Sequence, residues 1–458
     1  MKVIVCGAGQ VGSNIARHLA TEGNDVTVID QSAELVRKLS NSYDIQGMVG
    51  FGSHPDMLEN AGAANCDMLI AVTFHDEVNM VACQVAHSLF NVPTKIARVR
   101  AQGYLKPGWA NLFSRDHMPI DVIISPEIEV ARAVGRALHV PGATEMIPFA
   151  EDKVRLIGVH IPEECPIIDT PLRQLTELFP DLALSVTGIV RGGRVLVPSG
   201  DDQILAGDDV YFVVDTRQVA RAMPLFGHEE MEARRVIVIG GGNIGLFFAR
   251  QLEAENSSVK LKVIESSRAR AELIADQLNK TVVLHGDALD ADVLREANVR
   301  DAEAVIALTN DDEVNILASL MAKQEGGGKA ITLVNNQAYG SLVSSIGIDV
   351  VVNPRATTVS SILQHVRRGR IRRVHSLLDG AAEVIEAEAL ETSSLVGVSL
   401  RDLHFPDGIL VGAIVRGDAV LAPRGDTVIQ GHDRVIIFAK REMVKTVEKM
   451  LSVRLEFF

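Results

Sequence analysis

Short runs of hydrophobic residues alternate with amphipathic stretches along the first part of the chain. Runs of strand length lie at 3–6, 25–29, 68–72 and 95–99, and apolar residues recur at helical spacing over 10–22 and 77–90. Strands that alternate with helices form right-handed βαβ units, so this pattern predicts a parallel, doubly wound sheet of the Rossmann type. The stretch 154–214 differs, because its short alternating strands are divided by Gly, Pro and Asp turns, with one brief helix near 172–178. It predicts a small α+β domain.

The same pattern occurs twice. Three segments recur in order, 3–12 as 236–245, 68–79 as 304–315, and 188–201 as 413–426. A repeat of about 230 residues therefore predicts an α/β protein with two Rossmann-like doubly wound parallel-sheet domains, each followed by a small α+β domain. In the second copy we expect the strands of the small domain within 383–438 and its brief helix at 399–403.

Four domains follow from the repeat and from two helices that join its parts. Their expected ranges are 1–124, 125–227, 234–352 and 353–456. Helical patterns at 126–138 and 354–368 cross into the small domains, and each begins with Pro after a capping residue, Ser125 or Asn353. The polar stretch 227–235 joins the two copies.

Each Rossmann-like domain contains one glycine-rich loop between its first strand and first helix. The two loops consist of Gly7, Ala8, Gly9, Gln10, Val11 and Gly12, and of Gly240, Gly241, Gly242, Asn243, Ile244 and Gly245. In Gly-x-Gly-x-x-Gly, the first glycine permits a tight turn, the second lets a pyrophosphate approach the backbone, and the third allows close helix packing. The bland alternative is a tight turn alone. The position between a strand and a helix favours a nucleotide whose phosphate lies at the helix N-terminus.

An acidic residue ends the second strand of each sheet. Asp30 follows Val28-Ile29, and Glu265 follows Val263-Ile264. A carboxylate at this distance from the glycine loop accepts hydrogen bonds from a ribose 2′-hydroxyl and repels a 2′-phosphate. The sequence therefore predicts NAD or NADH, and not NADP(H), as the ligand.

Polar residues also follow the fourth strand of each sheet. Thr73 and Thr309 end that strand, and both following helices begin with acidic residues. These acids could serve a metal or an acid–base pair; the stronger interpretation is that Thr or a neighbour caps the helix while the acids complement its dipole. Because the carboxyl end of the strand faces the crevice, we expect Thr73, Phe74, Thr309 and Asn310 to contact the ligand.

Arginines supply two further candidates. Arg98 ends the fifth strand and could meet a phosphate or ribose, whereas the equivalent position near Leu333 is apolar, which suggests unequal sites. The run 367–373 holds five arginines, at 367, 368, 370, 372 and 373. It could bind lipid headgroups, nucleotide phosphates or an acidic partner, although a solvated helix end that pairs locally explains it as well.

Composition and charge exclude several classes of function. The 458 residues are 47% hydrophobic and carry a formal net charge of −14, which disfavours nucleic-acid binding and adsorption to anionic membranes. The sequence has no apolar run long enough to span a membrane, and residues 1–5 enter a strand directly instead of forming a signal peptide, so we expect a cytosolic protein. Its four cysteines lack metal-ligand spacing and are expected to be reduced core thiols.

The doubled features together resemble a known family. The glycine loops with their acids, the Gly50 and Gly286 turns, the Thr-x-x-Asp-Glu-x-Asn motif and the Ile-Val-Arg-Gly…Gly-Asp segments are similar to RCK domains, in which a KTN domain precedes a TrkA-C domain. The resemblance covers essentially the whole chain in tandem. Two departures leave the ligand of each site open: Phe51 stands where the second copy has Asp287, and Glu265 replaces Asp.

The resemblance implies a regulatory function. It implies two nucleotide-binding RCK-N domains and two RCK-C domains, with NAD or NADH bound, or ATP or ADP at one or both sites. It further implies a homo-oligomer, a tetramer forming a gating ring, that lies peripherally on the cytoplasmic side of the inner membrane. The implied partner is a TrkH- or TrkG-type membrane potassium channel subunit, and no nucleic acid is involved.

An NAD-dependent oxidoreductase is the competing class of function. Such an enzyme places a nicotinamide beside a positioned acid or base. The sequence contains no zinc-protease, nucleophile-elbow or P-loop motif, and its second and fourth domains carry no such constellation. We therefore favour a regulator without catalytic residues, whose domain arrangement responds to nucleotide binding.

Overall fold

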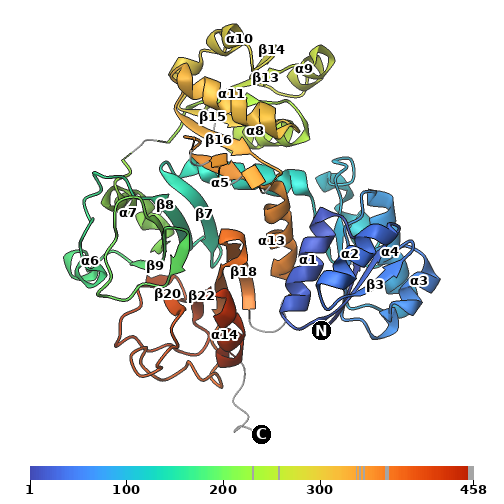
Figure 1. Ribbon diagram of the computed structural model, residues 1–458, viewed down its shortest axis with the longest axis horizontal. Coiled ribbons are helices and arrows are strands. Elements are labelled where there is room, and N and C mark those ends of the chain that lie inside the picture. Colours follow the sequence, from blue (N-terminus) through green and yellow to red (C-terminus); the bar gives the residue numbers. More distant parts are fainter. Residues whose placement is uncertain are drawn as a thin grey trace. The chain divides into compact units, whose positions relative to one another are not determined.

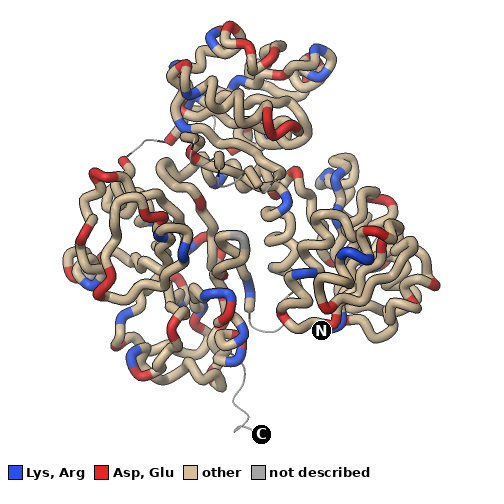
Figure 2. The backbone as a smooth tube through the Cα atoms, viewed as in Figure 1, with Lys and Arg blue, Asp and Glu red and all other residues tan. Residues whose placement is uncertain are grey.

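The computed structural model describes residues 1–229, 232–255, 258–336, 338–339, 342–343, 346–366 and 371–451 (Figure 1). Contacts divide the chain into two compact units. The first contains Met1–Ala131 and Asn353–Val366, and the second contains Arg132–Val352 and Arg367–Phe458. Figure 2 shows acidic residues interspersed with Lys and Arg over both units.

The first unit contains a parallel sheet of six strands in the order β3-β2-β1-β4-β5-β6. The strands are β1 (Lys2–Cys6), β2 (Asp25–Asp30), β3 (Gln46–Val49), β4 (Met68–Ala71), β5 (Thr94–Arg98) and β6 (Val122–Ile124). β1 and β4 are buried almost throughout, as expected for strands covered on both faces. The strand order reverses between β1 and β4, which is where a doubly wound sheet opens a crevice for a ligand.

Helices cover both faces of this sheet. They are α1 (Gln10–Thr21), α2 (Ala33–Ser42), α3 (Pro55–Asn60), α4 (Asp76–Phe90) and α13 (Pro354–Val366), with short 3-10 turns η1 (Ala63–Asn65) and η2 (Pro107–Phe113). Ile15 and Leu19 of α1 belong to the core on one face, and Met80 of α4 belongs to the core on the other.

One of these helices comes from the far end of the chain. α13 follows the second Rossmann-like sheet in sequence, yet its Val359, Ile362 and Val366 are buried in the first unit's core with α1. The Asn353 side chain caps α13, since its Oδ1 accepts hydrogen bonds from the backbone N–H groups of residues 355 and 356, both at 3.0 Å. Of the helix expected at 354–368, Pro354–Val366 is helical and covers the first sheet, while residues 367 and 368 lie outside the described residues.

The second unit repeats the sheet topology, with the order β14-β13-β12-β15-β16-β17. Its strands are β12 (Arg235–Ile239), β13 (Lys260–Glu265), β14 (Val282–His285), β15 (Ala304–Ala307), β16 (Lys329–Leu333) and β17 (Val350–Val352). The helices α8 (Asn243–Glu255), α9 (Arg268–Ala275), α10 (Ala291–Glu296) and α11 (Asp312–Gln324) connect them. The predicted pair of doubly wound parallel sheets is therefore confirmed.

The C-terminal part of α5 (Pro126–His139) belongs to this second unit. Lys329 Nζ donates hydrogen bonds to the carbonyl oxygens of Ala137 at 2.8 Å and Ala143 at 3.0 Å, and His139 lies 3.8 Å from the Glu255 carboxylate at the end of α8. The helix that follows the first sheet therefore reaches the second sheet's domain.

Two small antiparallel sheets complete the second unit, in the orders β10-β9-β11-β8-β7 and β18-β19-β22-β20-β21. The first has β7 (Ala143–Phe149), β8 (Val154–His160), β9 (Leu184–Arg191), β10 (Arg194–Leu196) and β11 (Asp209–Asp215), with helices α6 (Leu172–Leu178) and α7 (Val219–Ala222). The second has β18 (Ile371–Leu377), β19 (Ala382–Glu388), β20 (Ile409–Arg416), β21 (Ala419–Leu421), β22 (Arg434–Lys440) and the helix α14 (Val444–Leu451).

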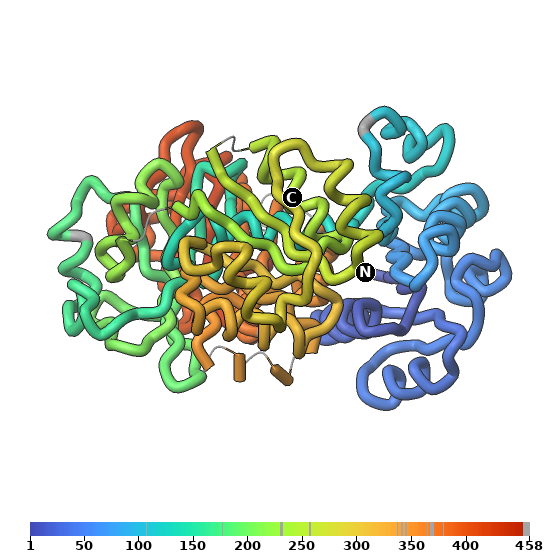
Figure 3. The backbone as a smooth tube through the Cα atoms, turned by 90° about the horizontal axis from the view of Figure 1, so that it is seen from above, coloured from blue at the N-terminus to red at the C-terminus, as the bar shows by residue number. Residues whose placement is uncertain are grey.

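The two small sheets share one hydrophobic core and lie side by side (Figures 1 and 3). Phe149 and Val213 of the first sheet and Phe438 of the second are buried there. Two glycines permit this approach: a Cβ on Gly188 would lie 2.7 Å from the Phe438 ring, and one on Gly412 would lie 2.8 Å from Val213. The two copies of the small domain therefore form a pseudo-symmetric pair.

The arginine of each repeated Ile-Val-Arg-Gly segment has a structural role. Arg191 forms a bidentate ion pair with Asp208, and Arg416 forms the same pair with Asp433, with Nη2···Oδ2 distances of 2.7 Å. Each aspartate is only 2% exposed and also accepts a backbone N–H from the turn that precedes it. A buried carboxylate needs such partners, which explains why both copies contain the pair.

The helix predicted at 399–403 is wrong. Residues 400–403 form turns, and the N–H groups of Leu400 and Arg401 donate to the carbonyls of Thr427 and Gly425. The first copy begins in the same way but then continues into α6. In the second copy His404 has a φ of +44° and Pro406 follows, so a helix cannot propagate.

Candidate nucleotide-binding sites

Steric contacts fix the first and last glycines of the first loop. Gly7 has a φ of +113°, and a Cβ there would lie 3.0 Å from the backbone nitrogen of Thr73. A Cβ on Gly12, in the first turn of α1, would lie 1.9 Å from the Gly7 carbonyl oxygen. Gly9 differs, because a Cβ there would have no neighbour within 4 Å. Gly9 therefore borders open space at the N-terminus of α1, where a phosphate can approach the backbone.

The second loop has the same geometry. Gly240 has a φ of +102° and its Cβ position lies 3.0 Å from the nitrogen of Thr309, while the Cβ position of Gly245 lies 2.0 Å from the Gly240 oxygen. Gly242 faces open space as Gly9 does. Gln10 and Val11 lie in the first turn of α1, and Asn243 and Ile244 lie in the first turn of α8.

The acid at the end of the second strand is tied to each loop. Asp30 Oδ2 accepts a hydrogen bond from the N–H of Ala8 at 2.6 Å, and its Oδ1 accepts from Ser32 at 2.8 Å. Glu265 makes the equivalent bonds to Gly241 at 2.7 Å and Ser267 at 2.8 Å. Glu265 therefore makes the same contacts as Asp30 although its side chain is one methylene longer. A carboxylate oxygen can accept more than one hydrogen bond, so each acid retains capacity for a ribose hydroxyl.

In both copies an Asn six residues after the Thr bonds to that Thr and to the end of the fifth strand, an arrangement that we call the Thr-Asn clamp. Asn79 Oδ1 accepts from the Thr73 hydroxyl at 2.7 Å and from its N–H at 2.8 Å, while its Nδ2 donates to the Arg98 carbonyl at 2.9 Å. Asn315 makes the same contacts with Thr309 and with the Leu333 carbonyl. Both asparagines are fully buried. The clamp joins the carboxyl ends of the fourth and fifth strands, a role that sequence reasoning missed.

The acids at the start of the next helix are also engaged. Asp76 Oδ2 accepts from the N–H groups of Arg100 at 2.9 Å and Ala101 at 2.7 Å. Asp312 holds the equivalent loop through the N–H groups of residues 335 and 336. Asp311 caps α11 by accepting from Val314 N at 2.9 Å, as the capping interpretation expected. In the part of the chain that the structure describes, His, Cys, Asp and Glu form no group suited to a metal.

Arg98 is the one predicted cation at this edge of the first sheet. It is half-buried, and its Nε is buried without a hydrogen-bond partner among the described residues. Burial, and then the neighbouring Arg100, lower the pKa of its guanidinium. The Arg98 carbonyl and the Leu333 carbonyl take equivalent positions in the two clamps, so the second copy has a buried leucine where the first has a cation.

Three arginines of the run at 367–373 lie outside the described residues. Arg372 pairs with Glu388, and Arg373 donates to the Pro148 carbonyl and lies 5.7 Å from the centroid of the Phe149 ring. Both residues lie on β18 and not at a helix end, and the Pro148 carbonyl is 225 residues from Arg373. For these two arginines, the interpretation as a solvated helix end that pairs locally is therefore wrong.

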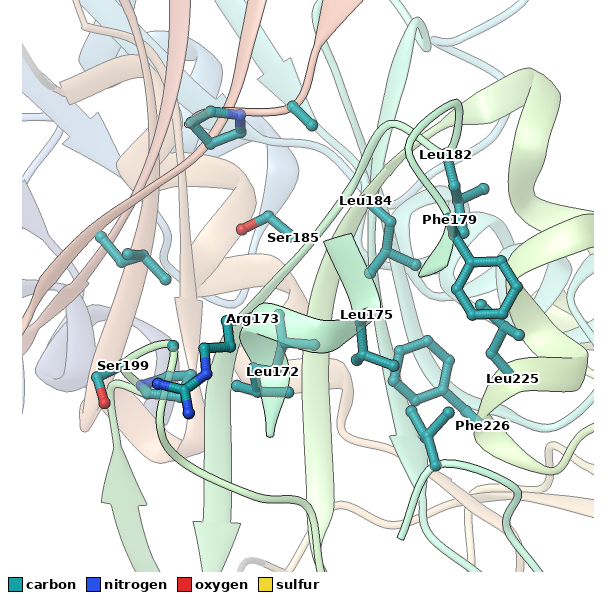
Figure 4. Close-up of a pocket in the computed structure, with 17 residues that line it drawn as sticks. Leu172, Arg173, Leu175, Phe179, Leu182, Leu184, Ser185, Ser199, Leu225 and Phe226 are labelled. Atoms are coloured by element: carbon teal, nitrogen blue, oxygen red, sulfur yellow. The ribbon is translucent and has the colours of Figure 1, made fainter. Parts of the chain in front are cut away.

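A pocket of about 210 Å³ is lined by residues of both small domains, and neither glycine loop contributes to its lining (Figure 4). Leucine and phenylalanine side chains of α6 and the segment after it contribute to its lining, among them Leu175, Phe179 and Leu182. Its Arg173 pairs with Asp201. Nothing in this lining supplies an acid and a base to one reacting group.

The four cysteines are buried free thiols, as expected. Burial raises the pKa of Cys6 to about 12, so this thiol is not a nucleophile at neutral pH. Among the described residues, no helix combines the length and hydrophobicity that crossing a membrane requires.

Comparisons with known proteins agree with this architecture. The TrkA-N domain model matches residues 3–126 and 236–354, and the TrkA-C domain model matches 156–227 and 384–452. The Trk system potassium uptake protein TrkA of Azorhizobium caulinodans is 55% identical over 458 residues and all of both chains, and that of Halomonas elongata is 43% identical over 462 residues, again covering both chains fully.

Solved structures share the fold. The GsuK RCK domain has a TM-score of 0.59 at 18% identity, covering 98% of this chain and 94% of that chain. The GsuK channel bound to NAD has the same score and identity and covers 98% and 78%.

Two glycine-loop domains alternating with two small antiparallel domains define a protein with a tandem pair of TrkA-N and TrkA-C domains. Within that class, the chain belongs to the family of the Trk system potassium uptake protein TrkA.

Proposed function

We propose that this chain is the nucleotide-binding regulatory subunit of a Trk-type potassium uptake system, with NAD or NADH as its ligand. The observation that carries the proposal is the pair of loops in which Gly9 and Gly242 border open space beside tethered acids. Full-length identity of 55% to a potassium uptake protein supports it.

The proposed ligand contacts comprise both loops, their acids and the ends of the fourth and fifth strands. They are Gly7, Ala8, Gly9, Gln10, Val11, Gly12, Asp30, Thr73, Phe74 and Arg98 in the first copy, and Gly240, Gly241, Gly242, Asn243, Ile244, Gly245, Glu265 and Thr309 in the second. ATP or ADP at one or both loops belongs to the same proposal. The functional domains have the ranges 1–124, 125–227, 234–352 and 353–456.

The proposed partner is a TrkH- or TrkG-type channel subunit, on the cytoplasmic side of the inner membrane. A tetramer of this chain forms a gating ring and binds that subunit peripherally. No catalytic residue is proposed, because ligand binding alone can shift the balance between two domain arrangements.

The packing of α13 on α1 offers a route for the signal. A phosphate at the first glycine loop contacts the N-terminus of α1, and α1 also packs against Ile362 and Val366 of α13. The chain runs from α13 into β18 of the second small domain. A change in the position of α1 on ligand binding is therefore passed to the segment that enters the small domains.

The experiment measures potassium flux through the channel subunit in proteoliposomes, with and without this protein and NADH or NAD. We expect nucleotide-dependent flux with the natural sequence and loss of that dependence with Gly9→Val plus Gly242→Val, since branched side chains fill the space left for phosphate. Gly200→Val is the matched control, because a Cβ there makes only an ordinary 3.4 Å contact with Arg173. Flux that ignores nucleotide in every sample contradicts the proposal, as does NADH oxidation with small carbonyl substrates at an enzyme-like rate.

A further inference from the structure

The two glycine-loop sites differ in the residues around their rims. Four positions around the loops are occupied differently in the two copies. One lies in the helix after the second strand, Leu35 of α2 and Arg270 of α9. Three lie at or just after the ends of strands: Phe51 and Asp287, Phe74 and Asn310, Arg98 and Leu333. The loops, acids and Thr-Asn clamps are the same in both. The differences therefore concern what surrounds the ligand and leave the phosphate-binding frame unchanged.

Phe51 lies on the side of the first loop that carries Asp30. Gly50 N donates to the Asp30 carbonyl at 2.9 Å, and a Cβ on Gly52 would lie 2.7 Å from the Cβ of Cys6, the residue before Gly7. The segment 50–52 is thus held between the acid and the end of β1. The Phe51 ring is 45% exposed and stacks on the His54 imidazole with centroids 4.9 Å apart.

Phe74 lies on the other side of the same loop. It follows Thr73, whose backbone nitrogen lies 3.0 Å from the Cβ position of Gly7. The ring is 73% exposed, and the Arg100 guanidinium lies 5.9 Å from its centroid. Arg98, with its unpartnered Nε, ends the next strand on this side.

A dinucleotide laid across this edge has one base on each side of the glycine loop. The ribose bound by Asp30 places the first base toward β2 and β3, and the pyrophosphate at Gly9 sends the second toward β4 and β5. Exposed aromatic rings stack on bases, which removes apolar surface from water at both partners. Phe51 and Phe74 stand on these two sides.

We propose that in the first site Phe51 stacks on the base beside Asp30 and Phe74 stacks on the base at the opposite end, so that Phe74 makes this site prefer a dinucleotide to a ligand without the second base. This inference rests on the proposed function and names the ligand class of one of its two sites. The second site lacks both rings, having Asp287 and Asn310 in their places, so it makes no such selection. There Arg270 donates to the Gly241 carbonyl at 2.7 Å, which puts a cation beside the loop where the first copy has Leu35.

The test uses the full-length protein with Gly242→Val, so that only the first site binds. Calorimetric titrations compare NADH with ADP-ribose, which has the same adenosine, pyrophosphate and second ribose but no nicotinamide. We expect NADH to bind about 10-fold more tightly, the scale of one base–aromatic stack. Phe74→Ala abolishes this advantage and leaves ADP-ribose affinity unchanged, whereas Phe51→Ala weakens both ligands by a similar factor.

Leu89→Ala is the matched control, because Leu89 is also a large exposed apolar residue, 59% exposed, and lies near the C-terminal end of α4. It should change neither affinity. Phe74→Tyr should keep the NADH advantage, since a tyrosine ring also stacks. Thermal unfolding of each variant checks that it folds, which we expect of Phe74→Ala because Phe74 is largely exposed.

Equal affinities for NADH and ADP-ribose in the protein with natural Phe74, or an advantage that survives Phe74→Ala, overturn the inference. The proposed function survives either result, because it requires only that a nucleotide bind and alter flux. Absence of all nucleotide binding at the first site also overturns the inference, and the flux assay with the natural sequence then decides the proposed function separately.

Discussion

Replacing Asp30 with alanine should weaken the first loop even when no ligand is present. Its carboxylate accepts two backbone N–H groups, from Ala8 at 2.6 Å and Ser32 at 2.8 Å. A hydrogen bond to a charged group contributes about 1.5–3 kcal/mol, but Asp30 is only half-buried and water can replace part of what is lost. We therefore expect a loss of about 2 kcal/mol from the free energy of unfolding.

Ligand affinity should fall as well. If the same carboxylate binds the ribose hydroxyls, Asp30→Ala removes a charge-assisted hydrogen bond and frees the loop that carries Gly9. A loss of about 1–3 kcal/mol corresponds to a dissociation constant about 5- to 150-fold higher. Guanidinium unfolding without nucleotide measures the first effect, and calorimetric titration with NADH in the Gly242→Val background measures the second.

The second copy supplies the control. Glu265 makes the same two bonds with one more methylene, so Asp30→Glu should retain most of both the stability and the affinity. Asp30→Asn should behave more like alanine, because an amide offers only one acceptor oxygen for the two donors. If Asp30→Ala changes neither quantity, the carboxylate neither holds the loop nor binds the ribose, and the reasoning fails.

Three further predictions concern a glycine loop, the Thr-Asn clamp and a hydrogen-bonded carboxylate at the end of α8. Gly12→Ala should destabilise the first unit by about 2 kcal/mol or more in urea unfolding, because its Cβ would lie 1.9 Å from the Gly7 oxygen, while Gly9→Ala, which meets nothing within 4 Å, should not. Asn79→Ala should cost about 3 kcal/mol, since it leaves buried groups of Thr73 and Arg98 unpaired, and an unchanged unfolding midpoint would contradict the clamp. Burial acts to raise the pKa of the Glu253 carboxyl group. Hydrogen bonds from Thr281, Lys280 and Asn279 together lower it by more, so that the pKa is about 2. Because the folded pKa lies below the unfolded value of about 4.3, its contribution is complete above that pH and is lost as the pH falls toward 2. Glu253→Gln should therefore flatten the acid limb of the stability curve, and an identical limb would refute this.

The sequence predicted the four sheets and both glycine loops because their signals are local. Buried parallel strands such as β4 are continuous apolar runs, and the close approach of Gly12 to the Gly7 carbonyl lies within one turn of the chain. The partner of α13 could not be predicted in this way. Its apolar positions indicate that one face is buried, but they do not identify the α1 surface that covers it, more than 300 residues earlier in the chain.

The sequence predicted which residue types lie at the candidate sites, but it predicted the roles of some of these residues less well. Thr73, Asp76 and Asn79 were visible as a repeated motif, and the acids were expected to complement a helix dipole. The structure shows that Asp76 holds the loop after β5 through two backbone N–H groups. Such a contact joins residues 24 and 25 apart, so only the folded chain reveals it. The missing helix at 399–403 could not be predicted either, because the positive φ of His404 is a property of the folded chain.

The position of α13 has a consequence for how the protein is made. During synthesis, the ribosome completes the first sheet and α1 long before residues 354–366 emerge, so the apolar side of α1 has no native cover while more than 200 further residues are added. Exposed apolar surface on a nascent domain invites misassembly and chaperone binding. A chain released after the first copy would face the same problem permanently. Two such half-chains could solve it by each supplying a helix to the other, which is how an exchanged element produces a dimer. Duplication within one chain makes that exchange intramolecular.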